Sequence, residues 1–240
     1  MSIKKLARSF LNFLHIDLNK GLEYDRLTKE VLKKVIRHDS HCIDVGCHEG
    51  EILDIMLSLA PDGNHVGFEP IPEMYLALKN NYASRATIYG YALSDSKGTA
   101  TFQVVKNAPA YSGLQRRNYN IPDPQIEEIT VEVTTLDAII PPTTKIALLK
   151  IDVEGGELAV MKGGHHLLLR DKPVIIFECG LGASDYYGTQ PEEVYRYLNA
   201  DIGLNIATLR MYLQGKQSLT LKEFSHLYAT NKEYYFVAFP

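Results

Sequence analysis

Two acidic residues, each at the end of an apolar run, indicate a ligand site. Asp44 precedes a turn bounded by Gly46 and Gly50, and Glu69 ends the next apolar run. In a sheet of parallel strands, the glycines let the turn approach a ligand, and the helix after it begins with free N–H groups. A carboxylate at the end of the second strand accepts hydrogen bonds from ribose hydroxyls. This spacing predicts a nucleotide-like cofactor.

The glycine spacing also separates two cofactor classes. A dinucleotide requires the pattern GxGxxG, which this chain lacks at residues 44–50, and His48 would obstruct a pyrophosphate. Asp44 lies just before the turn, where its charge repels a phosphate but suits an ammonium group. The pattern therefore favours S-adenosylmethionine over a nicotinamide cofactor, although Asp44 as a simple turn cap is the alternative.

A third apolar run brings two more acids to the same edge. Residues 146–153 read as a central parallel strand that delivers Asp152, and Glu154 follows. A substrate group that must lose a proton needs a base, and paired carboxylates can split their pKa values to supply one. We expect Asp152 to act as a base or metal ligand and Glu154 as its partner. His48 is a further candidate base, with a hydrogen-bonding role in the loop as the alternative.

The neighbours of this acidic pair have structural interpretations. Lys150 lies inside an apolar run, so we expect it to pair with a buried carboxylate such as Glu178, with catalysis as the alternative. Glu157 is expected to cap the following helix. His165 and His166 are expected on the back of the domain, as surface or packing residues.

These residues need elements to position them, and periodicity predicts those elements. Apolar residues at helical spacing predict helices over 24–37 and 51–60 and another that begins at Pro72. Strands are expected over 41–45, 65–69, 87–92, 99–105, 130–134, 146–153 and 173–179, and residues 205–213 and 234–239 are expected to form a closing antiparallel pair. The alternation predicts an α/β fold with a mostly parallel, doubly wound sheet.

Residues 106–128 are rich in proline and asparagine and are too long for a passive connection, so they predict a lid or substrate loop. Ser112 and Gly113 would close over donor and acceptor. For Arg116 and Arg117, two interpretations are open, binding of a phosphate or carboxylate of the acceptor and a solvated loop, and the second is favoured.

The bulk composition limits the function classes. A chain of 240 residues with a net charge of −4 suits one α/β domain and offers no basic field for nucleic acid. No apolar run is long enough to span a membrane. Cys42, Cys47 and Cys179 have no CxxC spacing, so we expect reduced thiols, a cytoplasmic location and no zinc, and we assign no metal site.

The N-terminal residues 1–18 show helical spacing of apolar residues with lysines and arginine between them. A membrane-surface helix and a helix that caps the domain or a dimer interface are both compatible with this pattern, and the second is favoured because the basic face is short. We divide the chain into an N-terminal helical segment, residues 1–38, and an α/β domain, residues 39–240, with a loop insertion over residues 106–128.

Four segments together resemble the FkbM family of methyltransferases. They are Ile43–Gly50, Phe68–Pro70, Ala92–Asp95 and, most specifically, Leu148–Glu157 with its Lys-Ile-Asp-Val-Glu-Gly core, and the resemblance spans residues 25–180. It implies a class I, S-adenosylmethionine-dependent methyltransferase that acts on a hydroxyl of a sugar, glycan or natural product. By the resemblance, the cofactor would contact Asp44, Gly46, Cys47, His48, Gly50, Glu69, Pro70, Ala92, Leu93, Ser94 and Asp152. Cys47 and His48 stand where the family more often has alanine and asparagine.

Four other functions compete with this prediction. A module that binds the cofactor without catalysis would keep the same motifs, and so would a methyltransferase with another acceptor atom. A nicotinamide-dependent oxidoreductase is disfavoured by His48 and Asp44. A nucleic-acid acceptor is disfavoured because Asp152-Val153-Glu154-Gly155 cannot stack a base. The expected partner is a small-molecule or glycan acceptor, with a homodimer possible.

Overall fold

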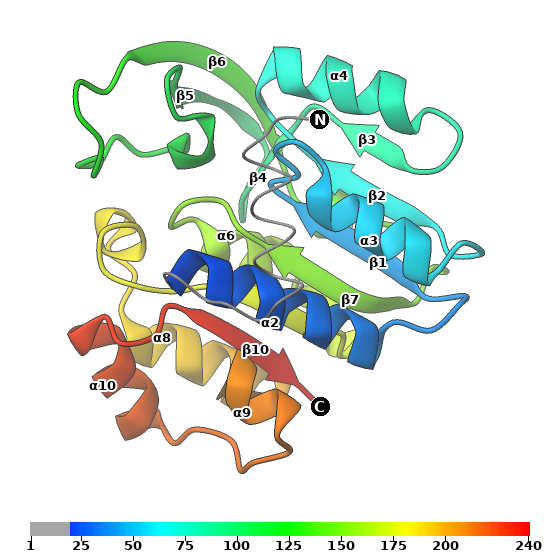
Figure 1. The fold of residues 1–240 in the computed structure, drawn as a ribbon, viewed down its shortest axis with the longest axis vertical. Helices are drawn as coiled ribbons and strands as arrows, with labels where there is room; N and C mark the ends of the chain where they lie inside the picture. Colours follow the sequence, from blue (N-terminus) through cyan, green and yellow to red (C-terminus); the bar gives the residue numbers. More distant parts are fainter. Residues whose placement is uncertain (1–19) are drawn as a thin grey trace.

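The computed structural model describes residues 20–240, so the helix expected over residues 1–18 lies outside the described residues. Within them, seven strands form one sheet in the order β3-β2-β1-β7-β8-β10-β9 (Figure 1). β10 runs antiparallel to both of its neighbours, and the other pairings are parallel. The strands are β1 (His41–Val45), β2 (His65–Phe68), β3 (Thr87–Tyr89), β7 (Ile146–Ile151), β8 (Val174–Glu178), β9 (Asn205–Thr208) and β10 (Tyr235–Phe239). The predicted doubly wound α/β fold is confirmed.

Alternation along the central strands divides the core into two layers. Cys42 of β1 and Leu148 of β7 belong to one buried cluster, whereas their neighbours Ile43 and Leu149 belong to the other. Successive side chains of a strand point to opposite faces, so a continuous apolar run can bury both faces of the sheet. Helices therefore cover both sides.

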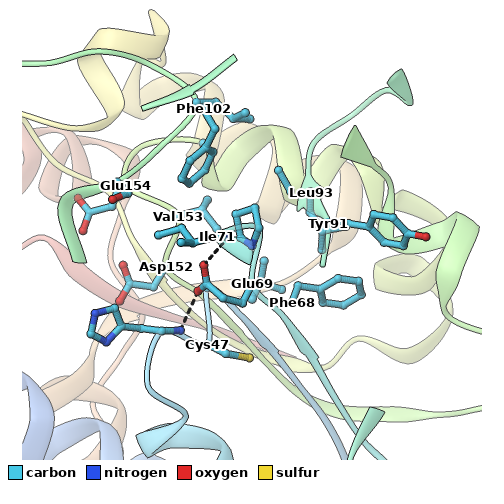
Figure 2. Close-up of a pocket in the computed structure, with 18 of the residues that line it drawn as sticks. Cys47, Phe68, Glu69, Ile71, Tyr91, Leu93, Phe102, Asp152, Val153 and Glu154 are labelled. Carbon is cyan, nitrogen blue, oxygen red and sulfur yellow. Dashed lines mark hydrogen bonds between the residues drawn. The ribbon is translucent and has the colours of Figure 1, made fainter. Parts of the chain in front are cut away.

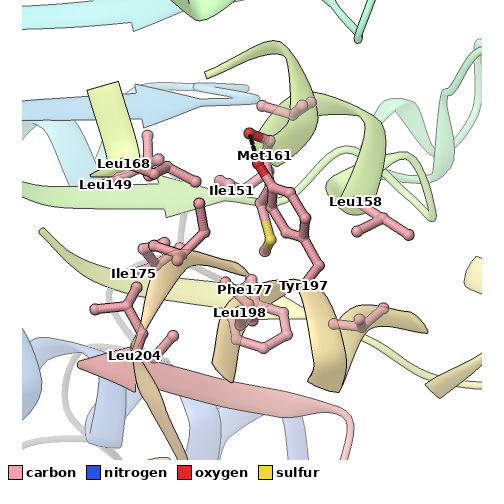
Figure 3. Close-up of a cluster of buried hydrophobic side chains, with 14 of the residues drawn as sticks. Leu149, Ile151, Leu158, Met161, Leu168, Ile175, Phe177, Tyr197, Leu198 and Leu204 are labelled. Atoms are coloured by element: carbon pink, nitrogen blue, oxygen red, sulfur yellow. Dashed lines mark hydrogen bonds between the residues drawn. The ribbon is translucent and has the colours of Figure 1, made fainter. Parts of the chain in front are cut away.

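The first layer contains α2, α3, α4 and α9, and Figure 1 shows α2 lying across the sheet beside α3. The second contains α5, α6, α7, α8 and α10 and a π-helical turn, residues 197–202. Figure 3 shows part of its core, where the hydroxyl of Tyr197 donates to the Met161 carbonyl at 3.0 Å. The helices are α2 (Lys20–Val35), α3 (Glu51–Leu59), α4 (Pro72–Tyr82), α5 (Leu136–Ile139), α6 (Glu157–Gly163), α7 (His165–Asp171), α8 (Pro191–Arg196), α9 (Leu209–Leu213) and α10 (Leu221–Thr230).

Local sequence signals begin several of these helices. α10 begins with a capping box, in which Thr220 accepts from the backbone of Glu223 and the Glu223 side chain accepts from that of Thr220. α4 begins with Pro72, whose missing N–H costs nothing in the first turn. Among residues 20–240, none of the helices is both long and apolar enough to cross a membrane.

A second sheet stands above the carboxyl edge of the first. It contains β4 (Ala92–Leu93), β6 (Ile126–Thr134) and β5 (Gly98–Val105), with β5 and β6 antiparallel. The strand expected over residues 87–92 is therefore wrong in extent: β3 ends at Tyr89, and Ala92 already pairs with β6. The loop predicted over 106–128 is shorter, residues 106–125, because the strand alternation of β6 begins at Ile126.

The tail also differs in detail from its prediction. β9 ends at Thr208, where the side chain of that threonine caps α9, so the second half of the segment 205–213 is helical. β9 and β10 do pair antiparallel at one edge of the sheet, as expected, and β10 lies between β8 and the edge strand β9.

Candidate active site

A cavity of about 650 Å³ opens at the carboxyl ends of β1, β2 and β7, beneath the second sheet. This volume is in the range of cofactor and ligand sites, and the position is where ligands bind in open α/β sheets. Figure 2 shows side chains from both sheets converging on it, with Phe102 of β5 facing Glu69 and Val153. Loop 106–125 contributes residues to its wall, among them Ser112 and Leu114.

The loop after β1 is held by the neighbouring strands. The N–H groups of Gly46 and Cys47 both donate to the Phe68 carbonyl at 3.0 Å. Gly46 has a φ of +78°, and a Cβ there would lie 2.0 Å from the Asp152 carbonyl oxygen. At Gly50, with a φ of +84°, a Cβ would lie 2.5 Å from the Tyr82 hydroxyl. Tight packing of the chain against itself, rather than approach to a ligand, therefore requires both glycines.

Glu69 is fixed by two backbone donors (Figure 2). The N–H groups of His48 and Ile71 donate to its two carboxylate oxygens at 2.9 and 3.0 Å. The side chain is 4% exposed, and burial, opposed by these two hydrogen bonds, raises the pKa of Glu69 to about 7. Each oxygen keeps a second lone pair, so the carboxylate can still accept hydrogen bonds from a diol.

His48 and Cys47 occupy the loop between these groups. His48 has a φ of +50° and its half-buried ring lines the cavity; burial lowers the pKa of the imidazole, which favours the neutral form. Cys47 also lines the cavity, but its thiol donates to the Asp44 carbonyl at 3.2 Å, and burial raises its pKa. His48 thus has an accessible base, whereas Cys47 is an inert thiol.

Lys150 joins the ends of two strands. Its ammonium donates to the Gly46 carbonyl at 3.0 Å and lies 3.4 Å from Asp44 and 3.5 Å from Asp152. Burial alone would lower the pKa of Lys150, but the charges of Asp152 and Asp44 outweigh it and raise the pKa. The expected pairing with Glu178 is therefore wrong: parallel register sets Lys150 beside Asp44. Asp44 is fully buried behind this ion pair.

Three carboxylates gather beyond Lys150. Asp152, Glu154 and Glu178 bring one oxygen each to within 4.8 Å of one another. The hydroxyl of Tyr235, on β10, donates to Asp152, and Arg117 of loop 106–125 forms an ion pair with Glu154. Burial raises the pKa of Glu154 to about 8, helped by the charge of Asp152 and opposed by Arg117.

The turn that presents Glu154 is strained and locally braced. Glu154 has a φ of +61°, a left-handed conformation that a residue with a side chain adopts only when its surroundings hold it. One carboxylate oxygen of Glu157 accepts from the N–H groups of Val153 and Gly155 at 3.0 and 3.1 Å. Glu157 was expected to cap α6, but the N-cap is Gly156: Glu157 lies in the first turn, and its carboxylate fixes the turn before the helix.

The structure gathers most of the predicted site residues on one cavity. Asp44 and Gly50 lie behind the wall, because Asp44 is enclosed with Lys150 and Gly50 faces Tyr82. His165 lies on α7, in the second helical layer, where it contacts Tyr197 of the π-helical turn, and it is outside the cavity wall. The predicted residues that line the cavity are Gly46, Cys47, His48, Glu69, Pro70, Ala92, Leu93, Ser94, Asp152 and Glu154.

Sequence reasoning missed several residues of this site or assigned them differently. Neither interpretation of Arg117, an acceptor-anion contact or a solvated loop side chain, anticipates its contacts: it pairs with Glu154 and donates to the Gly182 carbonyl at 2.9 Å. Tyr235 was read only as part of a strand. Ile71, beside Pro70, and Phe102, in β5, are recognisable in the sequence as apolar residues. Their pattern does not distinguish the wall of a cavity from the core.

The fold and the position of the cavity define the class I methyltransferase fold. A family model described as the methyltransferase FkbM domain matches residues 44–206, which is more than half of the chain. The chain therefore belongs to the FkbM methyltransferase family, and this membership implies S-adenosylmethionine as the methyl donor. The predicted family, enzyme class and cofactor are confirmed.

A solved structure agrees at the level of the fold, and a second match is weaker. The methyltransferase FkbM of Methylobacillus flagellatus KT matches with a TM-score of 0.52 and 16% identity, over 85% of this chain and 44% of that one. The present chain thus spans less than half of that protein. Precorrin-6y C5,15-methyltransferase of Geobacter metallireducens GS-15 matches with a TM-score of 0.44 and 14% identity, over 76% and 72%. The comparison with curated proteins gives no match.

The residues present fit S-adenosylmethionine. The buried carboxylate of Glu69 can accept hydrogen bonds from the two ribose hydroxyls. The apolar side chains of Ile71, Leu93 and Phe102 line the same cavity and suit a purine. Backbone of the loop at Gly46 and His48 lies on the same wall. When bound, the cofactor supplies an electrophilic methyl group on a sulfonium.

Proposed function

We propose that this enzyme methylates a hydroxyl of a sugar, glycan or natural product. The wall of Gly46, His48 and Glu69 is called the donor end here, and the wall of Asp152 and Glu154 the acceptor end. The observation that carries the proposal is that two carboxylates line the acceptor end of the same cavity. An alcohol must lose its proton when it takes up a methyl group, and a positioned carboxylate accepts that proton.

The two carboxylates have different surroundings, which suggests different roles. Asp152 accepts from the Tyr235 hydroxyl and lies 3.5 Å from the Lys150 ammonium, and both contacts hold its carboxylate in one orientation. We assign it the orientation of the acceptor hydroxyl. Glu154, with a pKa raised to about 8, is the better match for a proton transfer near neutral pH, and we assign it the role of general base.

The charges of the acceptor end also limit the acceptor. Lys150 and Arg117, the cations of this wall, both pair with carboxylates of the protein. Among residues 20–240, neither of these two cations is thus free to pair with a phosphate or carboxylate of an acceptor. An acceptor with an anionic group near its reacting hydroxyl would find no counter-charge from them, so the proposal favours an uncharged acceptor.

A methyl-transfer assay tests the proposal directly. The protein is incubated with S-adenosylmethionine labelled in its methyl group and with panels of neutral sugars, oligosaccharides and hydroxylated natural products. We expect a labelled methyl ether, identified by mass spectrometry and NMR. Asp152→Asn is expected to lose this product while it still binds S-adenosylhomocysteine. A methyl group on nitrogen or carbon, or undiminished turnover in Asp152→Asn, would contradict the assignment.

A further inference from the structure

Arg117 reaches from loop 106–125 into the body of the domain. Its guanidinium pairs with Glu154 and donates to the Gly182 carbonyl at 2.9 Å. Although the residue lies on a surface loop, its side chain is only 8% exposed. The guanidinium also lies 5.5 and 5.8 Å from the ring centroids of Tyr111 and Tyr119. Its own loop therefore encloses it on one side and the domain on the other.

The first part of the loop is anchored without Arg117. Gly113 exchanges two backbone hydrogen bonds with Gln103 of β5, at 2.8 and 3.2 Å, and the N–H of Lys106 donates to the Gln125 carbonyl at 2.8 Å. Beyond Gly113, Arg117 is joined by the N–H of Asn118, which donates to the Tyr186 hydroxyl at 3.2 Å. The tip of the loop thus depends on side-chain contacts of a kind that open more readily than a strand ladder.

The same loop forms one wall of the cavity. Ala110, Ser112, Leu114 and Gln115 line it together with Glu69 and Leu93 of the opposite wall. A ligand that fills the cavity must therefore pass this loop or wait for it to move. Closure of such loops excludes water and commits the bound substrate.

The ion pair with Arg117 also orients the Glu154 side chain. The carboxylate of Glu157 fixes the backbone of the turn, but it leaves the Glu154 side chain to other partners. An exposed carboxylate on a left-handed residue would sample several rotamers, whereas a guanidinium fork holds it in one.

We propose that Arg117 is a positioning residue that completes the site: it pins the Glu154 carboxylate at the acceptor end and latches loop 106–125 over the bound donor. Both effects depend on the same ion pair, so the general base is in place only when the loop is closed. This inference rests on the proposed function where it takes Glu154 as the base. The latch itself requires only the loop, the cavity and the ion pair.

The test compares four proteins: wild type, Arg117→Ala, Glu154→Gln and the double variant. Hydrogen exchange followed by mass spectrometry reports opening of residues 114–121 in the free protein. Stopped-flow displacement reports the dissociation rate of S-adenosylhomocysteine. We expect each single variant to raise the exchange of this segment and to speed dissociation about tenfold. The double variant should add little, because both substitutions break the same contact.

Two further variants separate a latch from a general loss of stability. Arg116→Ala removes a neighbouring, exposed arginine of the same loop and should leave exchange, dissociation and Tm unchanged. Arg117→Lys keeps the charge but loses the fork, so it should recover part of the effect.

Unchanged exchange and dissociation in Arg117→Ala, or additive effects in the double variant, would overturn the proposal. If Arg117→Ala fails to fold, Glu154→Gln alone tests the contact from its other side. Failure of the wild type to bind S-adenosylhomocysteine would count against the proposed donor end, and exchange in the free protein would still decide the latch.

Discussion

The donor and acceptor ends of one cavity are built from different kinds of contact. At the donor end, Glu69 binds backbone N–H groups of His48 and Ile71, which are 21 and 2 positions away in the chain. At the acceptor end, Glu154 and Asp152 are held by Arg117 and Tyr235, which are 37 and 83 positions away. Local backbone geometry holds the donor end, and side chains from a loop and from the last strand hold the acceptor end. The first arrangement is suited to a constant ligand and the second to one that differs between enzymes.

The largest effect should come from removing the base at the acceptor end. Glu154→Gln keeps the shape of the side chain but removes its proton-accepting charge, so kcat should fall by about a thousandfold. Initial rates of methyl transfer measure this, and calorimetry with S-adenosylhomocysteine should show that the donor still binds, within about tenfold of the wild type. A variant that retains more than a tenth of the wild-type rate would remove Glu154 from the role of base.

The group that joins the two ends should matter most for stability. Lys150→Met would leave Asp44, which is fully buried, without its cation, at a cost of about 3–5 kcal/mol in the free energy of unfolding. Urea unfolding measures this cost. Lys162→Met is the matched control, since its partner Glu193 is on the surface, and it should cost at most about 1 kcal/mol. Equal costs in the two variants would show that the strand ends are not joined through Lys150.

Binding of the methyl donor should depend on pH, because the donor end contains Glu69. Burial raises the pKa of Glu69 to about 7, and its ionised form is the better acceptor for ribose hydroxyls. Binding therefore favours the deprotonated state, and affinity for S-adenosylhomocysteine should increase with pH through 7 and level off above it. The expected gain from pH 6 to pH 8 is roughly tenfold. In Glu69→Gln the profile should be flat near 7, and a slope that persists there would assign the titration to another group.

The smallest effect should come from the hydroxyl that the last strand contributes. Tyr235→Phe removes the hydrogen bond to Asp152 and should lower kcat by about tenfold or less, with little change in donor affinity. Tyr234→Phe changes the neighbouring residue, whose ring packs on Tyr24, and should leave the rate unchanged. Equal rates in Tyr235→Phe and Tyr234→Phe would mean that Asp152 does not need its distant partner.

The same contrast explains what the sequence could predict. The donor end follows from residues that are close in the chain: a turn between Gly46 and Gly50 and an acid at the end of the next strand. The strand that delivers Asp152 was equally visible as an apolar run. The fold class followed from the alternation of such runs with helical patterns, because each pattern is local.

The acceptor end depends on contacts that periodicity does not encode. The pattern of residues 234–239 predicted a strand, but its place between β8 and β9, which brings Tyr235 to Asp152, is a property of topology. The composition of residues 106–128 predicts a lid, but neither interpretation of Arg117, an anion contact or a solvated side chain, includes Glu154, because that partner lies 37 residues away. Lys150 was given the wrong carboxylate because the register of β1 and β7 is set only in the folded sheet.

The central claim is that Glu69 anchors the methyl donor at the donor end, and calorimetric titration with S-adenosylhomocysteine tests it most directly. The wild type should bind with micromolar affinity, and Glu69→Ala should bind about a hundredfold more weakly, since two charge-assisted hydrogen bonds to ribose are lost. NADH, titrated in parallel, should not bind. Wild-type affinity in Glu69→Ala, or binding of NADH in place of S-adenosylhomocysteine, would contradict the account.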